Sequence, residues 1–231
     1  MALNIDHHRF ILAQILKEIY SNISIAPLLG LKGGTALYLF YNLPRFSVDL
    51  DFNLLKTTEK EKVWKKINEI LNKFGAIKEK REKRATLFFL LSYEEKAQNV
   101  KVKISKRLFP DRYEVKNYLG ISMLVLRKED MFAHKLAALS QRKNVANRDF
   151  FDIWFFMKND WDINKKLVEI RTGKNFKDYL RECVEVVEKM DERYILQGLG
   201  EILDTNYKNW VKKNLKKELL FLMKYYSEKN S

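Results

Sequence analysis

Cysteine, proline and glycine are all scarce in this chain, and each scarcity excludes a class of protein. Among the 231 residues there are one cysteine, three prolines and eight glycines. A single cysteine, Cys183, excludes an internal disulfide and fits a reducing compartment, and its valine neighbours favour burial. So few prolines and glycines leave little room for linkers or disorder. No apolar run approaches the roughly 20 residues of a membrane span, and no signal peptide is expected. The sequence therefore predicts a cytoplasmic, globular protein with no membrane partner.

Positive charge is in excess. The chain has 44 lysines and arginines against 30 aspartates and glutamates, for a net charge of +14. Such an excess favours a polyanionic partner, such as RNA or DNA, whose binding would depend strongly on salt. A basic face is expected on the last helix, from Lys212, Lys213, Lys216 and Lys217. A lysine-rich surface that is merely solvated is the alternative.

Residues 32–53, KGGTALYLFYNLPRFSVDLDFN, hold the densest group of chemically informative residues. Gly33 and Gly34 follow an apolar run, 26–31, that is expected to form a buried strand, and they precede a helix that Thr35 can cap. Two glycines before a helix N-terminus allow a phosphate to approach the backbone, where free N–H groups favour anions. The pair predicts a phosphate-binding turn, with an ordinary turn as the alternative.

The end of this stretch places two carboxylates on one face of a strand. Asp49 and Asp51 lie two residues apart in an alternating segment, 48–54, so their side chains point the same way. Adjacent carboxylates repel each other unless a cation lies between them, and Mg²⁺ is often bound by one or two carboxylates plus substrate phosphates. The alternative is the solvated face of an edge strand. Because Arg45 and Ser47 lie between the glycines and the carboxylates, about fifteen residues apart, we favour a phosphate and metal site.

KGGTALYLFYNLPRFSVDLDF resembles the first motif of the nucleotidyltransferase toxins of the AbiEii/AbiGii family, a branch of the DNA polymerase β-like nucleotidyltransferase superfamily. In that motif a glycine pair and a helix precede Arg-x-Ser-x-Asp-x-Asp. The positions that match it are Gly33, Gly34, Arg45, Ser47, Asp49 and Asp51. The resemblance implies that Asp49 and Asp51 are catalytic residues that hold Mg²⁺. The glycines and Ser47 would then cradle the triphosphate of an NTP, and Lys32 and Arg45 would offset its charge.

Lys103 departs from the pattern of this superfamily. It lies in an alternating segment, VKVKIS, that is expected to form a strand over 100–105. In polymerase β-like enzymes a third metal-binding carboxylate commonly comes from a later strand, and related toxins often have an acidic residue where Lys103 stands. A lysine does not hold a metal, although it could contact a phosphate. The departure puts a site of three carboxylates in doubt.

The apolar period changes from two to about 3.6 near residue 127. The sequence therefore predicts an α/β (α+β) fold with two domains. Residues 1–126 would form a polymerase β-like nucleotidyltransferase core with a mixed sheet, and residues 127–231 a helical domain. Helices of the second domain are expected over 128–142, 148–158, 167–170, 179–190, 194–203 and 207–226.

FAHKLAAL and NRDFFDI resemble the later motifs of the same toxins, a lysine on one helix and Arg-Asp-x-x-Asp on the next. The matched positions are Lys135, Arg148, Asp149 and Asp152. The resemblance implies that Lys135 and Asp152 complete the catalytic set and that Arg148 and Asp149 serve nucleotide binding. Two alternatives are structural. A Lys135–Asp152 salt bridge could join two helices, or Arg148 and Asp152 could form an ordinary surface pair.

Together these patterns predict a Mg²⁺-dependent nucleotidyltransferase that adds a nucleotide from an NTP to an acceptor hydroxyl. The family resemblance implies the toxin of a toxin–antitoxin or phage-defence system, with a cognate antitoxin as partner and RNA, above all tRNA, as acceptor. One alternative keeps the chemistry and replaces RNA by a protein hydroxyl. The other is a degenerate protein, with Lys103 in place of the acid, that binds nucleotide or RNA without transfer.

Overall fold

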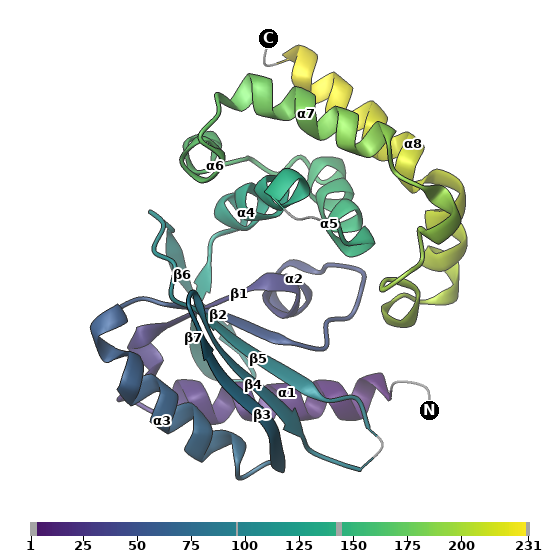
Figure 1. Ribbon diagram of the computed structural model, residues 1–231. Coiled ribbons are helices and arrows are strands. Elements are labelled where there is room, and N and C mark those ends of the chain that lie inside the picture. The colour runs from purple at the N-terminus through teal and green to yellow at the C-terminus, as the bar shows by residue number, and fades with distance from the viewer. Residues whose placement is uncertain (1–3, 96, 142–144, 230–231) are drawn as a thin grey trace. The chain divides into compact units, whose positions relative to one another are not determined.

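The computed structural model describes residues 4–95, 97–141 and 145–229 (Figure 1). Arg142, the last residue of the helix expected over 128–142, lies outside the described residues.

The chain divides into two compact units, Met1–Arg127 and Lys128–Ser231. The division lies one residue after the boundary that the change of apolar period indicates. The first unit contains all the described strands, and the second is helical. None of the described helices is both long enough and apolar enough to span a membrane.

Unit 1 is built on a mixed sheet of seven strands in the order β3-β4-β5-β2-β1-β7-β6. Its strands are β1 (Leu29–Lys32), β2 (Leu50–Leu54), β3 (Ala76–Lys83), β4 (Thr86–Ser92), β5 (Val100–Ser105), β6 (Tyr113–Tyr118) and β7 (Ile121–Leu126). The β1–β7 and β2–β5 pairs are parallel and the other pairs are antiparallel. The mixed α/β fold class predicted from the sequence is confirmed.

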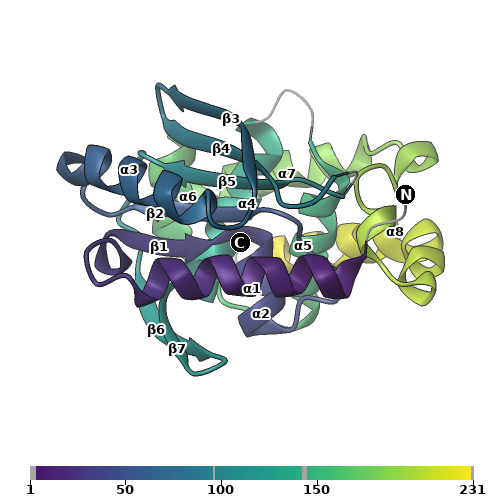
Figure 2. The same cartoon turned by 90° about the horizontal axis from the view of Figure 1, so that it is seen from below.

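Helices cover both faces of this sheet. They are α1 (Ile5–Ser21), α2 (Gly33–Tyr41) and α3 (Lys60–Leu71), with short 3₁₀ turns η1 (Ala26–Leu28) and η2 (Thr57–Glu59). Helices α1 and α3 lie on one face and α2 on the other (Figures 1 and 2). Helix α1 buries Leu12, Ile15, Leu16 and Ile19, spaced as one stripe of a helix, against the core.

The segment before β1 differs from its prediction. A buried strand is expected over 26–31, whereas Ala26–Leu28 form a 3₁₀ turn and the strand begins at Leu29. Pro27 lies in the first turn of η1. Its fixed φ suits a helical turn, and its missing N–H would remove a hydrogen bond from a central strand.

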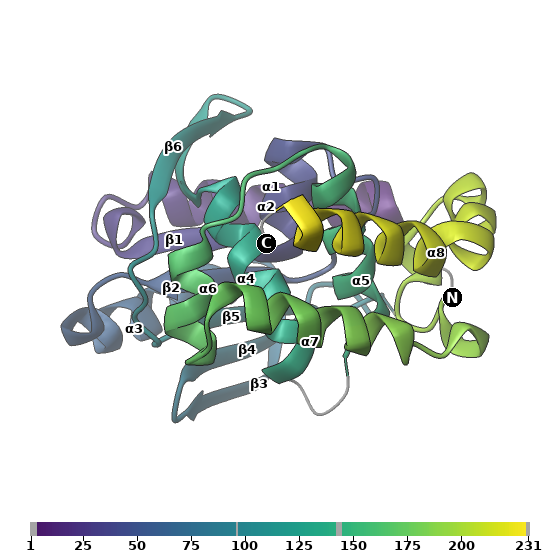
Figure 3. The same cartoon turned by 90° about the horizontal axis from the view of Figure 1, so that it is seen from above.

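Unit 2 consists of five helices and two 3₁₀ turns in its described part. They are α4 (Lys128–Gln141), α5 (Asn147–Lys158), α6 (Lys165–Thr172), α7 (Phe176–Glu188), η3 (Glu192–Tyr194), η4 (Gly200–Ile202) and α8 (Thr205–Lys229). Helix α8 packs on α5 and α7, and Figure 3 shows α7 and α8 side by side. Trp154 and Trp210 join α5 to α8 with ring centroids 4.1 Å apart. Cys183 is fully buried in α7, as its valine neighbours predict.

The helix expected over 194–203 is wrong. Turns and the short 3₁₀ segments η3 and η4 occupy this region instead. Gly198 has a φ of +68°, a left-handed conformation that an α-helix does not continue through.

Candidate functional site

Strand pairing places two lysines beside Asp51. Asp51 in β2 is the register partner of Lys32 in the antiparallel β1 and of Lys103 in the parallel β5. Directly opposed residues point to the same face of a sheet, so the three side chains form a row across the central strands. Asp49 lies on the same face, just before β2 begins at Leu50. The sheet therefore surrounds the predicted metal-binding pair with positive charge.

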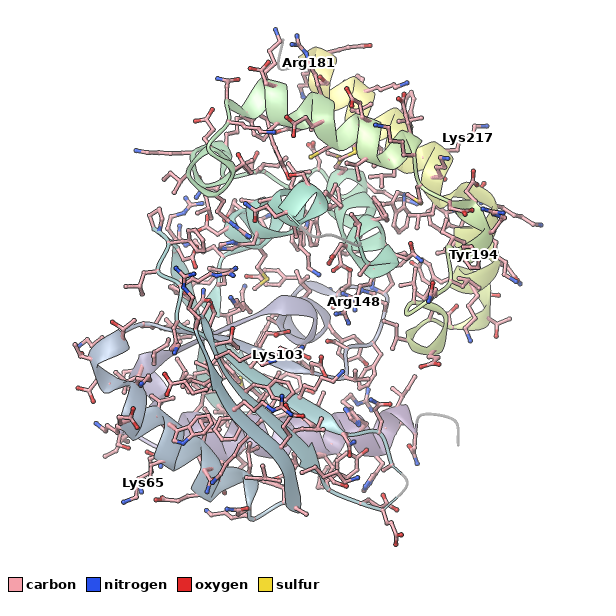
Figure 4. The ribbon with its side chains drawn as sticks, in the orientation of Figure 1. Lys65, Lys103, Arg148, Arg181, Tyr194 and Lys217 are labelled. Atoms are coloured by element: carbon pink, nitrogen blue, oxygen red, sulfur yellow. The ribbon has the colours of Figure 1, made fainter. Side chains whose placement is uncertain are left out.

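Lys103 forms an ion pair with both carboxylates. Its Nζ lies 2.7 Å from Asp49 Oδ2 and 3.9 Å from Asp51 Oδ1. The side chain of Asp49 is 10% exposed, whereas those of Asp51 and Lys103 are 30% and 31% exposed. The ammonium of Lys103 thus lies where two adjacent carboxylates need a cation. Figure 4 labels Lys103 on β5.

One carboxylate oxygen of Asp49, Oδ1, is buried and has no hydrogen-bond partner among the described residues. A buried carboxylate oxygen without a partner is costly, and such atoms often mark the place of an ion or ligand. Among the described residues, no group of three or more histidine, cysteine, aspartate or glutamate side chains could hold a metal ion. Asp49 and Asp51 nevertheless fit a hard divalent cation that takes its other ligands from phosphates and water.

The glycine pair makes room for the acidic and basic side chains. Gly33 has a φ of +78°, and a Cβ there would lie 2.8 Å from Asp51 Oδ2. A Cβ at Gly34 would lie 2.7 Å from Ser47 Oγ and 3.2 Å from Arg45 Nη2. The N-terminus of α2 therefore approaches Asp51, Ser47 and Arg45 more closely than any other residue type would allow. The structure brings the residues of the first motif together.

Thr35 does not cap α2, which is a correction to the sequence prediction. The helix begins at Gly33 with Lys32 at the N-cap, so Thr35 lies inside its first turn. The buried hydroxyl of Thr35 donates a hydrogen bond to the carbonyl oxygen of Asp49 at 2.5 Å. Thr35 thus holds the segment that carries Asp49 against the helix.

Arg45 and Ser47 are both buried beside the N-terminus of α2. Arg45 Nη1 donates a hydrogen bond to the carbonyl oxygen of Phe46 at 3.0 Å. A buried guanidinium close to the backbone orders the loop before β2 and adds positive charge behind the glycine turn.

Three polar residues that the sequence analysis does not single out support Lys32. Lys32 Nζ donates to Asn53 Oδ1 at 2.5 Å. Asn53 Nδ2 lies 2.7 Å from both Asp111 Oδ2 and the hydroxyl of Tyr113. Asn53 points to the same face of the sheet as Asp49 and Asp51. The alternation of side chains over residues 48–54 is the one sequence signal that indicates this position for Asn53. Asp111 and Tyr113 reach this position through the tertiary fold.

His8 is a further residue that sequence reasoning missed. Its Nε2 lies 3.0 Å from the carbonyl oxygen of Val48, and its Nδ1 lies 2.9 Å from the hydroxyl of Tyr93. Burial lowers the pKa of His8 below its ordinary value of 6.5, with the hydrogen bond to Val48 opposing the shift. His8 therefore anchors the chain just before Asp49 from the side of α1.

Unit 2 gathers the later motif around one lysine. Lys135 Nζ in α4 lies 2.8 Å from Asp149 Oδ1 and 2.6 Å from Asp152 Oδ2 in α5. Both aspartates are fully buried, and the Lys135 side chain is 16% exposed. The Lys135–Asp152 bridge between two helices, one of the structural alternatives, is therefore present. It neither requires nor excludes a catalytic role.

Arg148 lies at the start of α5 (Figure 4). The alternative of an ordinary Arg148–Asp152 surface pair is wrong, because Asp152 is fully buried. The predicted site residues therefore form two groups. Unit 1 brings together Lys32, Gly33, Gly34, Arg45, Ser47, Asp49 and Asp51. Unit 2 brings together Lys135, Asp149 and Asp152.

Comparison with known proteins identifies the family. Residues 14–217 match the family described as nucleotidyl transferase AbiEii toxin of type IV toxin–antitoxin systems. No curated protein matches the chain.

Two crystal structures of Helicobacter pylori proteins share the fold. One protein, described as a candidate nucleotidyltransferase, has a TM-score of 0.65 and 20% identity, and the alignment covers 99% of this chain and 97% of that one. The other, JHP933, has a TM-score of 0.63 and 22% identity, with 99% and 94% covered. At these identities the likeness establishes the fold alone. The family match, in contrast, spans most of the chain, and it implies a nucleotide substrate and an antitoxin partner. The chain therefore belongs to the AbiEii nucleotidyl transferase toxins of type IV toxin–antitoxin systems and is a nucleotidyltransferase.

Proposed function

We propose that this nucleotidyltransferase uses Mg²⁺ to transfer a nucleotide from an NTP to a hydroxyl group of RNA, with tRNA as the acceptor. The observation that carries the metal and nucleotide assignment is the convergence of Asp49, Asp51 and Gly33 on one face of the sheet. One oxygen of Asp49 is buried there without a partner among the described residues. A Cβ at Gly33 would collide with Asp51. A carboxylate pair beside an open helix N-terminus suits a metal-bound triphosphate.

In this proposal Asp49 and Asp51 hold Mg²⁺, which when bound neutralises charge that develops on the phosphates. Gly33 and Gly34 leave backbone N–H groups open to phosphate oxygens, with Ser47 beside them. The acceptor hydroxyl oxygen forms a bond to the α-phosphorus, the bond to the β-phosphate oxygen breaks, and pyrophosphate leaves. Positioning and charge compensation supply most of the rate in such a displacement.

The later motif supplies the remaining roles in the proposal. As the family resemblance implies, Lys135 offsets phosphate charge and Arg148 serves nucleotide binding. Asp152, or its neighbour Asp149, is the candidate base that takes the proton of the acceptor hydroxyl. Both carboxylates hold the ammonium of Lys135 within 2.8 Å, so an additional role for each is to orient Lys135.

The surface of α8 favours RNA as the acceptor. The lysines expected to form a basic face on this helix differ in their partners. Lys216 donates a hydrogen bond to the carbonyl oxygen of Met190 at 2.8 Å. Lys213 and Lys217, in contrast, are exposed and form no ion pair with described residues. Figure 4 labels Lys217.

Two aromatic side chains follow Lys213 and Lys217 along α8 at the same spacing of four residues. Phe221 and Tyr225 are exposed, and their rings stack with centroids 6.4 Å apart and an interplanar angle of 13°. Residues four apart are neighbours on a helix surface, so Phe221 follows Lys217. Exposed aromatic rings beside unpaired lysines suit single-stranded nucleic acid, whose bases stack and whose phosphates need cations.

The test of transfer uses α-labelled NTPs. Purified protein, Mg²⁺ and each NTP in turn are incubated with total bacterial RNA and, separately, with lysate protein. We expect label from one NTP in a tRNA-sized band, and its loss in Asp49→Asn/Asp51→Asn, which keeps the shape of both side chains and removes their charge. Thermal unfolding checks that this variant is folded. Full transfer by the double variant would overturn the site, and label only in protein would replace the acceptor.

The test of the acceptor surface compares charge reversals on the two units. We expect Lys213→Glu/Lys217→Glu to weaken RNA binding about tenfold or more and to lower the salt slope by about 2. The matched control is Lys65→Glu/Lys78→Glu, which reverses two exposed lysines of unit 1 that form no ion pair with described residues. Figure 4 labels Lys65. Equal losses in both variants would mean that net charge alone, and not α8, determines the affinity.

A further inference from the structure

We propose that Lys103 is a resident counterion of the Asp49–Asp51 pair that makes metal binding depend on nucleotide. Without nucleotide, the ammonium of Lys103 occupies the position between the carboxylates and opposes a free divalent ion. When a nucleotide binds, its phosphates offer Lys103 another anionic partner and the metal takes the carboxylates. The inference rests on the proposed function, because it deepens the role of the same site.

Register is the first observation that supports this role. Because β2 and β5 are parallel and Asp51 pairs with Lys103, the lysine is fixed beside the acidic pair by the sheet itself. Its flanking residues Val102 and Ile104 are fully buried and anchor β5 in the core. Lys103 is thus held in place by its backbone and not by a flexible loop, and its contact with Asp49 is part of the folded unit.

Charge is the second observation. The Lys103 ammonium is 2.7 Å from Asp49 Oδ2, one of the oxygens that would hold the metal, and 3.9 Å from Asp51 Oδ1. A divalent ion bound to these carboxylates would lie within a few ångströms of that ammonium, and like charges at such distances repel strongly. On binding the metal, Asp49 would also lose its ion pair with Lys103. Both effects weaken binding of a metal ion that arrives alone.

Freedom to move is the third observation. The Lys103 side chain is 31% exposed, and its ammonium is a compact charge on a flexible stem. Asp49 Oδ1 is buried without a partner among the described residues, so the pair keeps one oxygen available to a second cation. Lys103 can therefore turn from Asp49 toward a phosphate without any change in the strand that carries it.

These observations predict a coupling between metal and nucleotide. A nucleotide that draws Lys103 away raises the affinity for metal, and the metal raises the affinity for nucleotide by the same factor. A lysine that only stabilised the sheet would leave this factor unchanged when it is replaced.

The experiment measures Mn²⁺ binding by electron paramagnetic resonance, without nucleotide and with an NTP analogue whose α,β-linkage is not cleaved. We expect Lys103→Met to bind Mn²⁺ at least tenfold more tightly than the wild type without nucleotide, and to lose most of the enhancement by the analogue. Lys103→Gln, a second uncharged variant, should behave alike. Lys103→Arg, which keeps the charge, and Lys101→Met, an exposed lysine on the same face of β5, should resemble the wild type.

Asp49→Asn/Asp51→Asn separates the two ways of failing. If this variant loses Mn²⁺ binding and Lys103→Met binds no better than the wild type, the counterion role is overturned and the metal site stands. If the aspartate variant binds Mn²⁺ as the wild type does, the proposed metal site itself is overturned. Equal tightening in Lys101→Met would also overturn the specific role of Lys103.

Discussion

Each unit contains one lysine that pairs with two aspartates, and the two groups differ in how far water reaches them. In unit 1, Lys103 and Asp51 are each close to one-third exposed, and Asp49 keeps one oxygen without a partner among the described residues. An ion pair that water reaches contributes little to stability, because the charges are screened and well solvated without each other. This group can therefore exchange its lysine for another cation at small cost to the fold.

In unit 2 the corresponding group, Lys135 with Asp149 and Asp152, is shielded from water. We call it the closed group, and we call Lys103 with Asp49 and Asp51 the open group. Asp149 and Asp152 are fully buried, and Lys135 is mostly buried between them. Removing the ammonium of Lys135 would take a positive partner at 2.6–2.8 Å from two carboxylates that water does not reach, and this is costly. The difference teaches that the same three side-chain types form a solvent-accessible ion pair in one setting and a buried one, with a larger contribution to stability, in the other.

The largest effect is expected from Lys135→Met. Removing the ammonium leaves two buried carboxylates, and breaking a buried pair in this way costs about 3–5 kcal/mol of unfolding free energy. Urea unfolding measures the loss. Cys183, the single cysteine, reports on unit 2 directly, because burial raises the pKa of its thiol to about 12 and the group reacts only when the unit opens.

The matched control is Lys166→Met, which replaces an exposed lysine of the same unit. It should leave both the urea midpoint and the labelling rate of Cys183 nearly unchanged. If Lys135→Met behaved like this control, the closed group would not be the structural element that its burial indicates.

A smaller effect, about 1–2 kcal/mol, is expected from alanine at two glycines with left-handed backbones. Gly33 in unit 1 and Gly173 in unit 2 have φ values of +78° and +71°. A Cβ at Gly173 would meet no atom within 4 Å, whereas at Gly33 it would lie 2.8 Å from Asp51 Oδ2. Both variants should therefore unfold more easily, but Gly33→Ala alone should also lose nucleotidyl transfer.

Transfer assays at equal folded fractions measure this difference. Loss of activity in Gly173→Ala to the same degree would mean that reduced stability, and not the displacement of Asp51, accounts for the effect.

Local patterns explain how much of this architecture is predictable from the sequence. The helical stripe of α1 and the alternation of β5 depend on neighbouring residues, and both elements occur where these patterns predict them. The first motif likewise concentrates the glycines and carboxylates in one short stretch. The helix expected over 194–203 failed because apolar spacing does not reveal a left-handed glycine such as Gly198.

Long-range pairing explains what the sequence did not reveal. Lys103 and Asp49 are 54 residues apart, and their contact depends on the parallel register of β2 and β5. Asn53 and Tyr113 are 60 residues apart and likewise form their hydrogen bond only in the assembled sheet. Sequence reasoning marked Lys103 as a missing acid, and its role as a counterion became visible only with the sheet assembled.

A still smaller effect is expected from Lys103→Met on stability. Water reaches Lys103 and Asp51, but the side chain of Asp49 is only 10% exposed and loses its ion pair. We therefore expect the free energy of unfolding to fall by about 1 kcal/mol, well below the loss from Lys135→Met. Urea unfolding of the two variants side by side measures the contrast. A loss from Lys103→Met that matched the one from Lys135→Met would remove the distinction between the open and closed groups.

The smallest effect is a pH dependence that belongs to unit 1. Burial lowers the pKa of His8, so the folded chain holds this imidazole neutral, with one ring nitrogen donating to the carbonyl oxygen of Val48 and the other accepting from Tyr93. Between the lowered pKa and 6.5, the unfolded chain binds more protons than the folded chain. The contribution of His8 is therefore complete above pH 6.5 and is lost as the pH falls toward the lowered pKa.

His8→Gln tests this dependence, because glutamine can hydrogen-bond to the same partners and does not titrate. Urea unfolding at about pH 7.5 and about pH 5.5 brackets the ordinary histidine range. We expect the wild type to lose more stability between these values than the variant does. The added proton occupies Nδ1, so His8 no longer accepts from the Tyr93 hydroxyl, and a charge is placed in a buried part of unit 1. Protonation should therefore destabilise unit 1 and leave the closed group of unit 2 unaffected. Labelling of Cys183 should accordingly respond to pH equally in the wild type and in His8→Gln. An equal loss of stability in both proteins would show that His8 is not the group through which acid acts on this unit.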